Sequence, residues 1–191
     1  MDANTTQNQK GFTLVEIAIV LVIIGLLLGG VLKGQELITN SKIKSLTKDL
    51  EGIVAASYAY QDRTGRLAGD ATGSPAVTDG IINASQFWGD LRDEGFLSGV
   101  TGVAPSALRG PSHGLNGIFS AHPALAANMF GTKNFICAEN VEESIAQGID
   151  IKLDDGVPDA GEIRVGESIT TPRSSYVAAN AEKGVLLCKA L

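Results

Sequence analysis

The chain has 191 residues, a formal net charge of −6 and 44% hydrophobic residues. This length accommodates one medium domain, or one small domain with an appendage, and excludes a large multidomain enzyme. The negative net charge argues against a nucleic-acid-binding protein, because phosphates are bound by clustered lysine and arginine side chains.

A long apolar segment near the N-terminus is the dominant feature of the sequence. Sixteen of the 21 residues 12–32 are apolar, and residues 17–32 contain no charge. As an α-helix this segment would span roughly 30 Å, the thickness of the hydrocarbon core of a bilayer. The alternative is the apolar core of a cleavable secretory signal, which usually has about 7–15 residues and ends at a small-residue cleavage site. Because the apolar run continues directly into a patterned helix, we interpret it as a retained membrane helix.

Two features of this segment favour contact with other helices. Glu16 places an ionisable group in the apolar stretch, at a cost of roughly 2.5–3.5 kcal/mol near a helix centre and less near its end. It therefore needs a partner, unless it lies shallow enough to reach headgroups and water. Glycines spaced four residues apart let helix backbones approach closely in an apolar medium. Two pairs have this spacing: Gly25 with Gly29, and Gly30 with Gly34.

The string from Lys10 to Glu16, KGFTLVE, resembles the processing site of type IV prepilins and of the related pseudopilins of type II secretion. The likeness comprises a short polar leader ending in Lys-Gly, a phenylalanine, a glutamate as fifth residue of the cleaved chain, and an unbroken apolar helix. It implies a leader of residues 1–11, cut between Gly11 and Phe12 by a membrane-embedded prepilin peptidase that also N-methylates Phe12. It further implies that subunits leave the inner membrane and pack as a helical filament with their apolar helices in its core.

The same resemblance implies a role for Glu16, which would pair with the N-terminal amine of Phe12 in a neighbouring subunit and so set the register of assembly. One position departs from the family pattern. Many members have a proline 21 residues after the first mature residue, where the helix bends or melts, whereas this chain has Lys33. Because glycine costs about 1 kcal/mol in a helix interior, the glycines between residues 25 and 34 could weaken the helix locally, and no specific kink is predicted.

Apolar residues continue beyond the membrane segment at helical spacing. They recur mostly three or four residues apart from Leu37 to Tyr60 without an intervening proline, and Gly65 is the predicted stop. The pattern predicts one helix with two halves, a transmembrane or filament-core half over residues 12–32 and an amphipathic half over residues 33–64. Residues 65–191 would form a globular head packed on the apolar stripe of the second half.

The head contains short predicted elements separated by turn residues, which indicates an α+β domain whose small antiparallel sheet packs on the long helix, as in the type IV pilin-like fold. Two further helices are predicted, over residues 85–95 with Ser85 as N-cap, and over residues 141–153 with a capping box of Asn140 and Glu143. Trp88 is expected to be a core residue, with a platform for a ligand as the alternative. Strands are predicted over residues 134–138, 162–165, 176–179 and 185–188, and residues 104–117 are expected to form a loop.

Cys137 and Cys188 are the two cysteines of the chain. The predicted topology places both outside the cytoplasm, where disulfides persist, so a bond between them is favoured over free thiols. Closing a loop of about 50 residues would stabilise the head by roughly 4 kcal/mol. A disulfide that closes a C-terminal region also fits the resemblance to type IV pilins.

The acidic run over residues 149–159 suggests a calcium site. It is not an EF-hand, because Lys152 stands where an oxygen ligand is needed and the glycine falls one place late. Some pseudopilins bind calcium in C-terminal loops, so the resemblance leaves a loose site open. Its candidate ligands are Asp154, Asp155, Asp159 and Glu162. The alternative is a helix that ends in Asp-Asp-Gly and enters a turn, and no other cofactor is predicted.

Sequence signatures of enzymes are not found. His113 and His122 have no cysteine or carboxylate at metal-ligand spacing, and no Gly-x-Ser-x-Gly, P-loop or zinc-protease motif occurs. We therefore expect a structural subunit of a bacterial type IV pilus or related filament. The alternative within the same family is a pseudopilin of a type II secretion system. From another class, the alternative is a membrane-anchored adhesin or periplasmic enzyme that uses the helix as a tether.

The resemblance also implies partners and locations. The expected partners are further copies of the chain, the prepilin peptidase, the pilus or secretion assembly machinery, and the membrane. The protein is expected in the bacterial inner membrane as precursor and subunit pool, and in an extracellular or periplasmic filament after assembly. Major pilins, minor pilins and pseudopilins share the leader and the helix, so these features do not separate the three.

Overall fold

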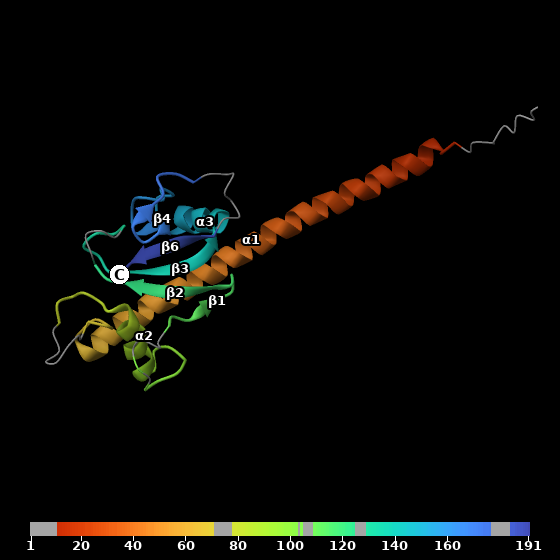
Figure 1. Ribbon diagram of the computed structural model, residues 1–191. Coiled ribbons are helices and arrows are strands. Elements are labelled where there is room, and N and C mark those ends of the chain that lie inside the picture. Colours follow the sequence, from red (N-terminus) through yellow and green to blue (C-terminus); the bar gives the residue numbers. More distant parts are fainter. Residues whose placement is uncertain (1–10, 71–77, 103, 105–108, 125–128, 177–183) are drawn as a thin grey trace, which may run out of the picture. The chain divides into compact units, whose positions relative to one another are not determined.

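The computed structural model describes residues 11–70, 78–102, 104, 109–124, 129–176 and 184–191. The chain divides into two compact units, residues 1–40 and 41–191. The first helix, α1 (Leu14–Thr64), contributes residues to both units, and all other helices and strands belong to the second (Figure 1). The amphipathic half expected over residues 33–64 is therefore part of the head unit from Ser41 onward.

The predicted long helix is confirmed as one continuous element over Leu14–Thr64. It ends where expected, because Gly65 has a φ of +76° and its N–H donates to the Gln61 carbonyl at 2.8 Å. A glycine in this left-handed conformation is a common helix terminator. Within the head unit, one stripe of the helix is buried: Leu46, Thr47, Leu50, Ile53, Ser57 and Tyr60.

The head unit contains a six-stranded sheet in which each pair of neighbours is antiparallel, in the order β1-β2-β3-β6-β4-β5. The fold is therefore α+β, as predicted. The strands are β1 (Ser112–His113), β2 (Gly117–His122), β3 (Phe135–Glu142), β4 (Ile163–Ser168), β5 (Thr171–Pro172) and β6 (Gly184–Ala190). Both edge strands have two residues, which leaves little unpaired edge for other chains to join.

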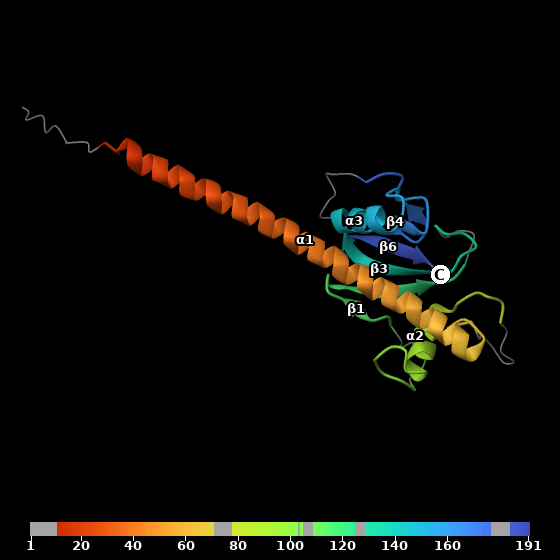
Figure 2. The ribbon, with the colours of Figure 1, turned by 180° about the vertical axis from the view of Figure 1, so that it is seen from behind.

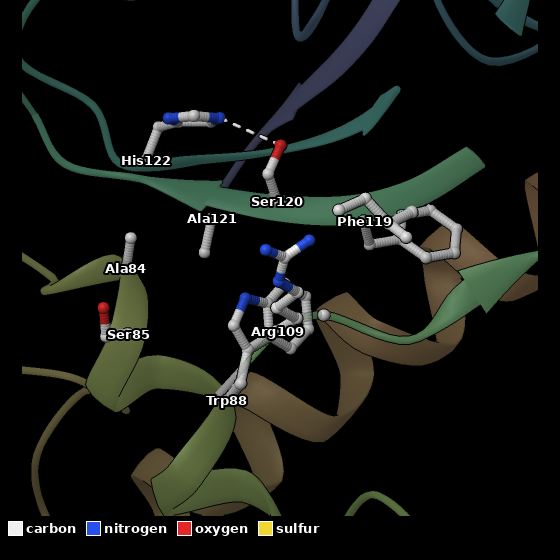
Figure 3. A pocket seen from close by; sticks show the side chains of 10 residues that line it. Ala84, Ser85, Trp88, Arg109, Phe119, Ser120, Ala121 and His122 are labelled. Carbon is white, nitrogen blue, oxygen red and sulfur yellow. Dashed lines mark hydrogen bonds between the residues drawn. The ribbon is translucent and has the colours of Figure 1, made fainter. Parts of the chain in front are cut away.

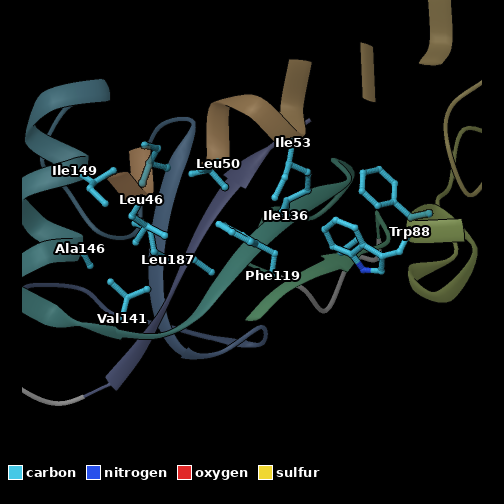
Figure 4. Close-up of a cluster of buried hydrophobic side chains, with 14 of the residues drawn as sticks. Leu46, Leu50, Ile53, Trp88, Phe119, Ile136, Val141, Ala146, Ile149 and Leu187 are labelled. Atoms are coloured by element: carbon cyan, nitrogen blue, oxygen red, sulfur yellow. The ribbon is translucent and has the colours of Figure 1, made fainter. Parts of the chain in front are cut away.

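One face of the sheet carries the main core of the head. The part of α1 that belongs to the head unit lies across this face, behind the sheet in Figure 1 and in front of it in Figure 2. Helices α2 (Ala84–Asp93) and α3 (Glu143–Leu153) pack against the same core. Figure 4 shows its centre, where side chains of α1, α3 and the strands interlock. Its most buried members include Leu46, Leu50, Phe119, Ile136, Ile145, Ile149 and Leu187.

The opposite face of the sheet carries a second, smaller cluster. It consists of Met129, Phe130, Phe135, Cys137, Cys188 and Ala190, with Ile169 and Leu186 at its margin. The alternation of side chains along a strand explains the separation, since Ile136 points to the main core while its neighbours Phe135 and Cys137 point to the other face. The sheet is thus covered by apolar residues on both faces, although α1 lies on only one.

Two predicted helix starts are wrong. The cap of α2 is Asn83, whose side chain accepts hydrogen bonds from the N–H groups of Ser85 and Gln86, so Ser85 lies inside the helix. The predicted capping box of Asn140 and Glu143 does not form either, because Asn140 belongs to β3, with a φ of +58°, and α3 has no side-chain cap. The predicted stop of α2 is confirmed, since Gly95 has a φ of +78°.

The predicted strands are correct in kind and too short. Observed β3, β4 and β6 each extend beyond the predicted ranges by one or more residues. Strand β2 was not predicted, and β1 lies in the region expected to be a loop. Of the predicted strand 176–179, Tyr176 lies outside any strand, and residues 177–179 fall outside the described residues.

Candidate functional site

The predicted processing site lies immediately before α1. Gly11, Phe12 and Thr13 precede the helix, and Phe12 is 84% exposed. A bond in exposed, non-helical backbone is accessible to a peptidase without unfolding of the helix. Residues 1–10 of the predicted leader lie outside the described residues.

A reciprocal pair of hydrogen bonds joins Thr13 and Glu16 at the start of α1. The Thr13 N–H and hydroxyl both donate to Oε2 of Glu16 at 2.8 Å, and the Glu16 N–H donates to the Thr13 hydroxyl at 3.3 Å. This is a capping box, which satisfies two of the backbone N–H groups that the first turn leaves unpaired. The Thr-x-x-Glu spacing is the sequence signal for this capping box, which was not predicted.

The carboxylate of Glu16 therefore has one oxygen engaged within its own chain. No described residue donates a hydrogen bond to its other oxygen, Oε1. A negative charge in the first turn also interacts favourably with the helix dipole. Glu16 thus has a local structural role in the single chain, in addition to any role toward a second subunit.

The apolar side chains of the first unit are exposed. Along residues 12–32 the large hydrophobic side chains are all between 46% and 86% exposed. Soluble monomers rarely expose a continuous apolar surface of this extent. In length and composition α1 also qualifies as a helix able to cross a membrane. The surface of the first unit is therefore suited to lipid or to other apolar helices.

The four predicted packing glycines have open surroundings. A Cβ added at any of these positions would meet no atom of the described chain within 4 Å: Gly25, Gly29, Gly30 and Gly34. Their small size therefore serves no contact within the described chain. The helix continues through Lys33, which pairs with Glu36 at 2.7 Å, so the missing family proline coincides with an uninterrupted helix.

The structure contains the predicted disulfide between Cys137 and Cys188. The two residues are direct partners across β3 and β6, and both are fully buried in the smaller apolar cluster. The 51-residue separation between them includes α3, β4 and β5. The bond thus ties the two central strands of the sheet together across most of the head's C-terminal half.

The four predicted calcium ligands do not form one group of neighbouring carboxylates, because Asp159 and Glu162 lie outside the group that contains Asp154 and Asp155. Asp154 Oδ2 accepts from the Ile163 N–H at 2.7 Å, and Asp155 Oδ1 accepts from the Val157 N–H at 2.8 Å. Glu162 forms an ion pair with Lys133 at 2.8 Å. Asp154 and Asp155 thus stabilise the turn after α3, as the alternative interpretation expected.

Two of the predicted ligands, Asp154 and Asp155, belong to an acidic group at the end of α3 that also includes Asp150. One carboxylate oxygen from each of Asp150, Asp154 and Asp155 lies within 4.8 Å of the others. Asp150 is fully buried, and the Tyr176 hydroxyl donates to its Oδ2 at 2.6 Å. Burial raises the pKa of Asp150, the Tyr176 hydrogen bond opposes that rise, and the nearby Asp155 and Asp154 add to it. A calcium site in this region stays a prediction.

Comparison with known proteins identifies the N-terminal part of the chain. Residues 6–32 match the family described as the prokaryotic N-terminal methylation motif. The chain carries the hallmark of the type IV prepilin and pseudopilin family. The match covers the cleavage region and the apolar helix, and it ends before the head. No curated protein matches the chain.

The motif supports a type IV pilin or pseudopilin precursor, and it implies processing by a prepilin peptidase and delivery to a pilus-type assembly machinery. Together with the apolar helix, it fits a membrane-anchored precursor. Proteins of this family are structural subunits and not enzymes.

Proposed function

We propose that this protein is a structural subunit of a type IV pilus or related filament. The precursor is cut after Gly11, Phe12 is N-methylated, and the mature subunit is stored in the membrane through the start of α1. The observation that carries the proposal is the combination of the methylation motif at residues 6–32 with the exposed apolar surface of the helix that follows it. That surface is stable in lipid, and it is equally stable against sister helices in a filament core.

Glu16 sets the register between neighbouring subunits in this proposal. After cleavage, Phe12 carries a positive N-terminal amine, and Oε1 of Glu16 has no partner in the described chain. A buried carboxylate and ammonium together cost much less than either alone. A subunit that enters out of register would leave both charges unpaired in an apolar core, and this penalty favours the correct position.

The glycines provide the closest points of approach between helices. Because a side chain at Gly25, Gly29, Gly30 or Gly34 would meet nothing in the described chain, these positions leave room for another backbone. The disulfide-linked head then remains at the filament surface, outside the cytoplasm, where its disulfide persists.

Mass spectrometry of the N-terminus tests this proposal. The protein is purified from the membranes of the cells that produce it, and its N-terminal peptide is sequenced. We expect a chain that begins at Phe12 with a methylated amine. A chain that retains Met1 and is found in the soluble fraction would contradict the proposal. Filaments on the cell surface would indicate a pilus, whereas filaments confined to the periplasm would indicate a pseudopilin.

A further inference from the structure

A small cavity lies in the head between the start of α2 and strand β2. Its volume is about 200 Å³, and its lining includes Ala84, Trp88, Arg109, Phe119 and Ala121. Figure 3 shows Arg109 and Trp88 facing this space from below β2, on the side to which Ala121 points. The side chains of Ser120 and His122 point to the other side of the strand and hydrogen-bond to each other there at 3.0 Å.

Trp88 offers an unused hydrogen-bond donor to this cavity. Its side chain is 2% exposed, and its ring packs edge-on against Phe87 with 4.9 Å between ring centroids. No acceptor for its indole N–H is found among the described residues. Buried tryptophan N–H groups usually have a partner. Protein atoms do not fully enclose the indole nitrogen, so a ligand in the cavity can reach it (Figure 3).

Arg109 places an unpaired positive charge at the same cavity. None of the described carboxylates forms an ion pair with it. Its backbone is fixed, since the Arg92 guanidinium donates to the Arg109 carbonyl at 2.5 Å. The next residue, Gly110, lies so close to β2 and Trp88 that a Cβ would stand 1.8 Å from the Phe119 carbonyl oxygen and 2.8 Å from the Trp88 ring. Only glycine fits at this position, and the resulting path of the backbone places the base of the Arg109 side chain beside the Trp88 ring.

The rest of the cavity is mainly apolar, and this limits the ligand. Ala84, Phe119 and Ala121 contribute apolar walls, and Ser85 is the remaining neutral donor on α2. Drug-sized ligands occupy cavities of roughly 300–1,000 Å³, so a cavity of about 200 Å³ fits a smaller molecule. One guanidinium and one indole N–H match the two oxygens of a single carboxylate.

We propose that the head binds a small carboxylic acid in this cavity, with its carboxylate on Arg109 and Trp88 and its compact apolar body against Phe119 and Ala121. The site lies within the head unit and is separate from the helix that serves assembly. It does not depend on the proposed filament function, and a failure of one leaves the other standing.

Fluorescence of Trp88 tests the proposal directly, because it is the single tryptophan of the chain. The full chain in detergent micelles is titrated at neutral pH with cyclohexanecarboxylate, and in parallel with cyclohexylmethanol, which has a similar shape and no charge. We expect a saturable change with the acid and binding at least about tenfold weaker with the alcohol, because a charge-assisted hydrogen bond is lost.

Two arginine variants identify the group responsible. Arg109→Gln is expected to weaken binding of the acid at least about tenfold, because it keeps a neutral donor but removes the charge. Arg63→Gln is the matched control, since Arg63 lies on α1, pairs with Glu94 and does not line the cavity, and binding should be unchanged. A linear, non-saturable response, equal binding of acid and alcohol, or an Arg109→Gln variant that binds like the wild type would overturn the proposal.

Discussion

At the scale of single residues, Glu16 combines two roles that can be separated by substitution. In the single chain it caps α1 through Thr13, and in the proposed filament it pairs with the amine of a neighbouring Phe12. Glutamine can replace glutamate in a capping box, but it carries no charge. Comparing Glu16→Gln with Glu16→Val therefore distinguishes the loss of charge from the loss of the cap.

We expect Glu16→Val and Glu16→Gln both to insert into the membrane and both to abolish filaments or build misregistered ones. The reason is that each leaves the amine of Phe12 without a counter-charge in an apolar core. Thr13→Ala is the matched control, because it removes part of the cap and keeps the charge. It should cost the helix about 0.5–2 kcal/mol and leave filaments in place. The yield of sheared filaments, measured against membrane-bound protein, checks this, and normal filaments from Glu16→Val would show that the assembly role is wrong.

The environment of His113 predicts that the stability of the head depends on pH. Its Nε2 hydrogen-bonds to the Glu139 carbonyl at 2.9 Å, and its Nδ1 accepts from the Leu115 N–H at 3.3 Å, which fits a neutral ring protonated on Nε2. Burial lowers the pKa of His113, and the hydrogen bond to Glu139 and nearby carboxylates oppose that shift only in part. Burial also lowers the pKa of His122.

The lowered pKa values of His113 and His122 make the folded state less stable at acidic pH. Because each folded-state pKa lies below its unfolded value of 6.5, the unfolded chain binds more protons below that pH, and stability falls as the pH decreases through it. We expect the Tm of the full chain in detergent to decrease as the pH is lowered from about 7.5 to about 5.5. His113→Gln should remove part of this slope, and the double variant with His122→Gln should remove more. A variant series that keeps the whole slope would place its origin elsewhere.

At the scale of elements, α1 has one segment that is buried in the head and another whose apolar side chains are exposed. Leu50 is fully buried in the head core, whereas Leu37, on the same helix, is 60% exposed. Leu50→Ala should therefore lower the free energy of unfolding of the head by about 2–5 kcal/mol. Leu37→Ala should change it by no more than about 0.5 kcal/mol. Denaturant unfolding of the two variants in detergent compares them, and equal losses would mean that Leu50 does not belong to the core.

The disulfide between β3 and β6 also stabilises the head. Because its cysteines are separated by 51 residues and pair across the central strands, its removal should destabilise the head by about 4 kcal/mol in the chain-entropy description. The test uses the double variant Cys137→Ala with Cys188→Ala, so that neither cysteine remains as a free buried thiol. A Tm equal to that of the wild type would contradict a stabilising role for this bond.

The predicted elements differ from the observed ones where one residue pattern fits two structures. Val141, Ile145, Ala146 and Ile149 are all buried in one core, so their spacing imitates a single helix. In the structure Val141 belongs to β3, which ends at Glu142, and α3 begins at Glu143 without a connecting loop. A bulge in β3 between Ala138 and Val141, with Asn140 at positive φ, lies just before this junction, and it has no periodic signal.

Strand β2 was missed for a related reason. Its sequence, GIFSAH, alternates apolar and polar residues only over the four positions 119–122, and it contains glycine, serine and histidine, which are weak strand signals. In the structure Phe119 and Ala121 face the main core, while Ser120 and His122 lie on the other face. Pairing with β3 determines this arrangement, and pairing between distant segments cannot be read from local composition.

At the scale of the whole molecule, the two proposed functional regions differ in how far the sequence predicts them. The processing site and the apolar helix occupy adjacent residues, so a motif of 27 residues, 6–32, is sufficient to recognise them. The cavity in the head depends on Trp88 and Arg109, which only the packing of α2 against β2 brings together. Local patterns predict the first kind of site, and tertiary contacts are needed for the second.

In the proposed function, the exposed apolar helix is held in the membrane before assembly and forms the filament core after it. Electron microscopy of material sheared from the cell surface, combined with mass spectrometry of the same fibres, tests it most directly. We predict fibres composed of this chain, with each subunit beginning at methylated Phe12. A chain that is processed at Gly11 but stays entirely in the membrane, with no fibre containing it on the surface or in the periplasm, would contradict the claim.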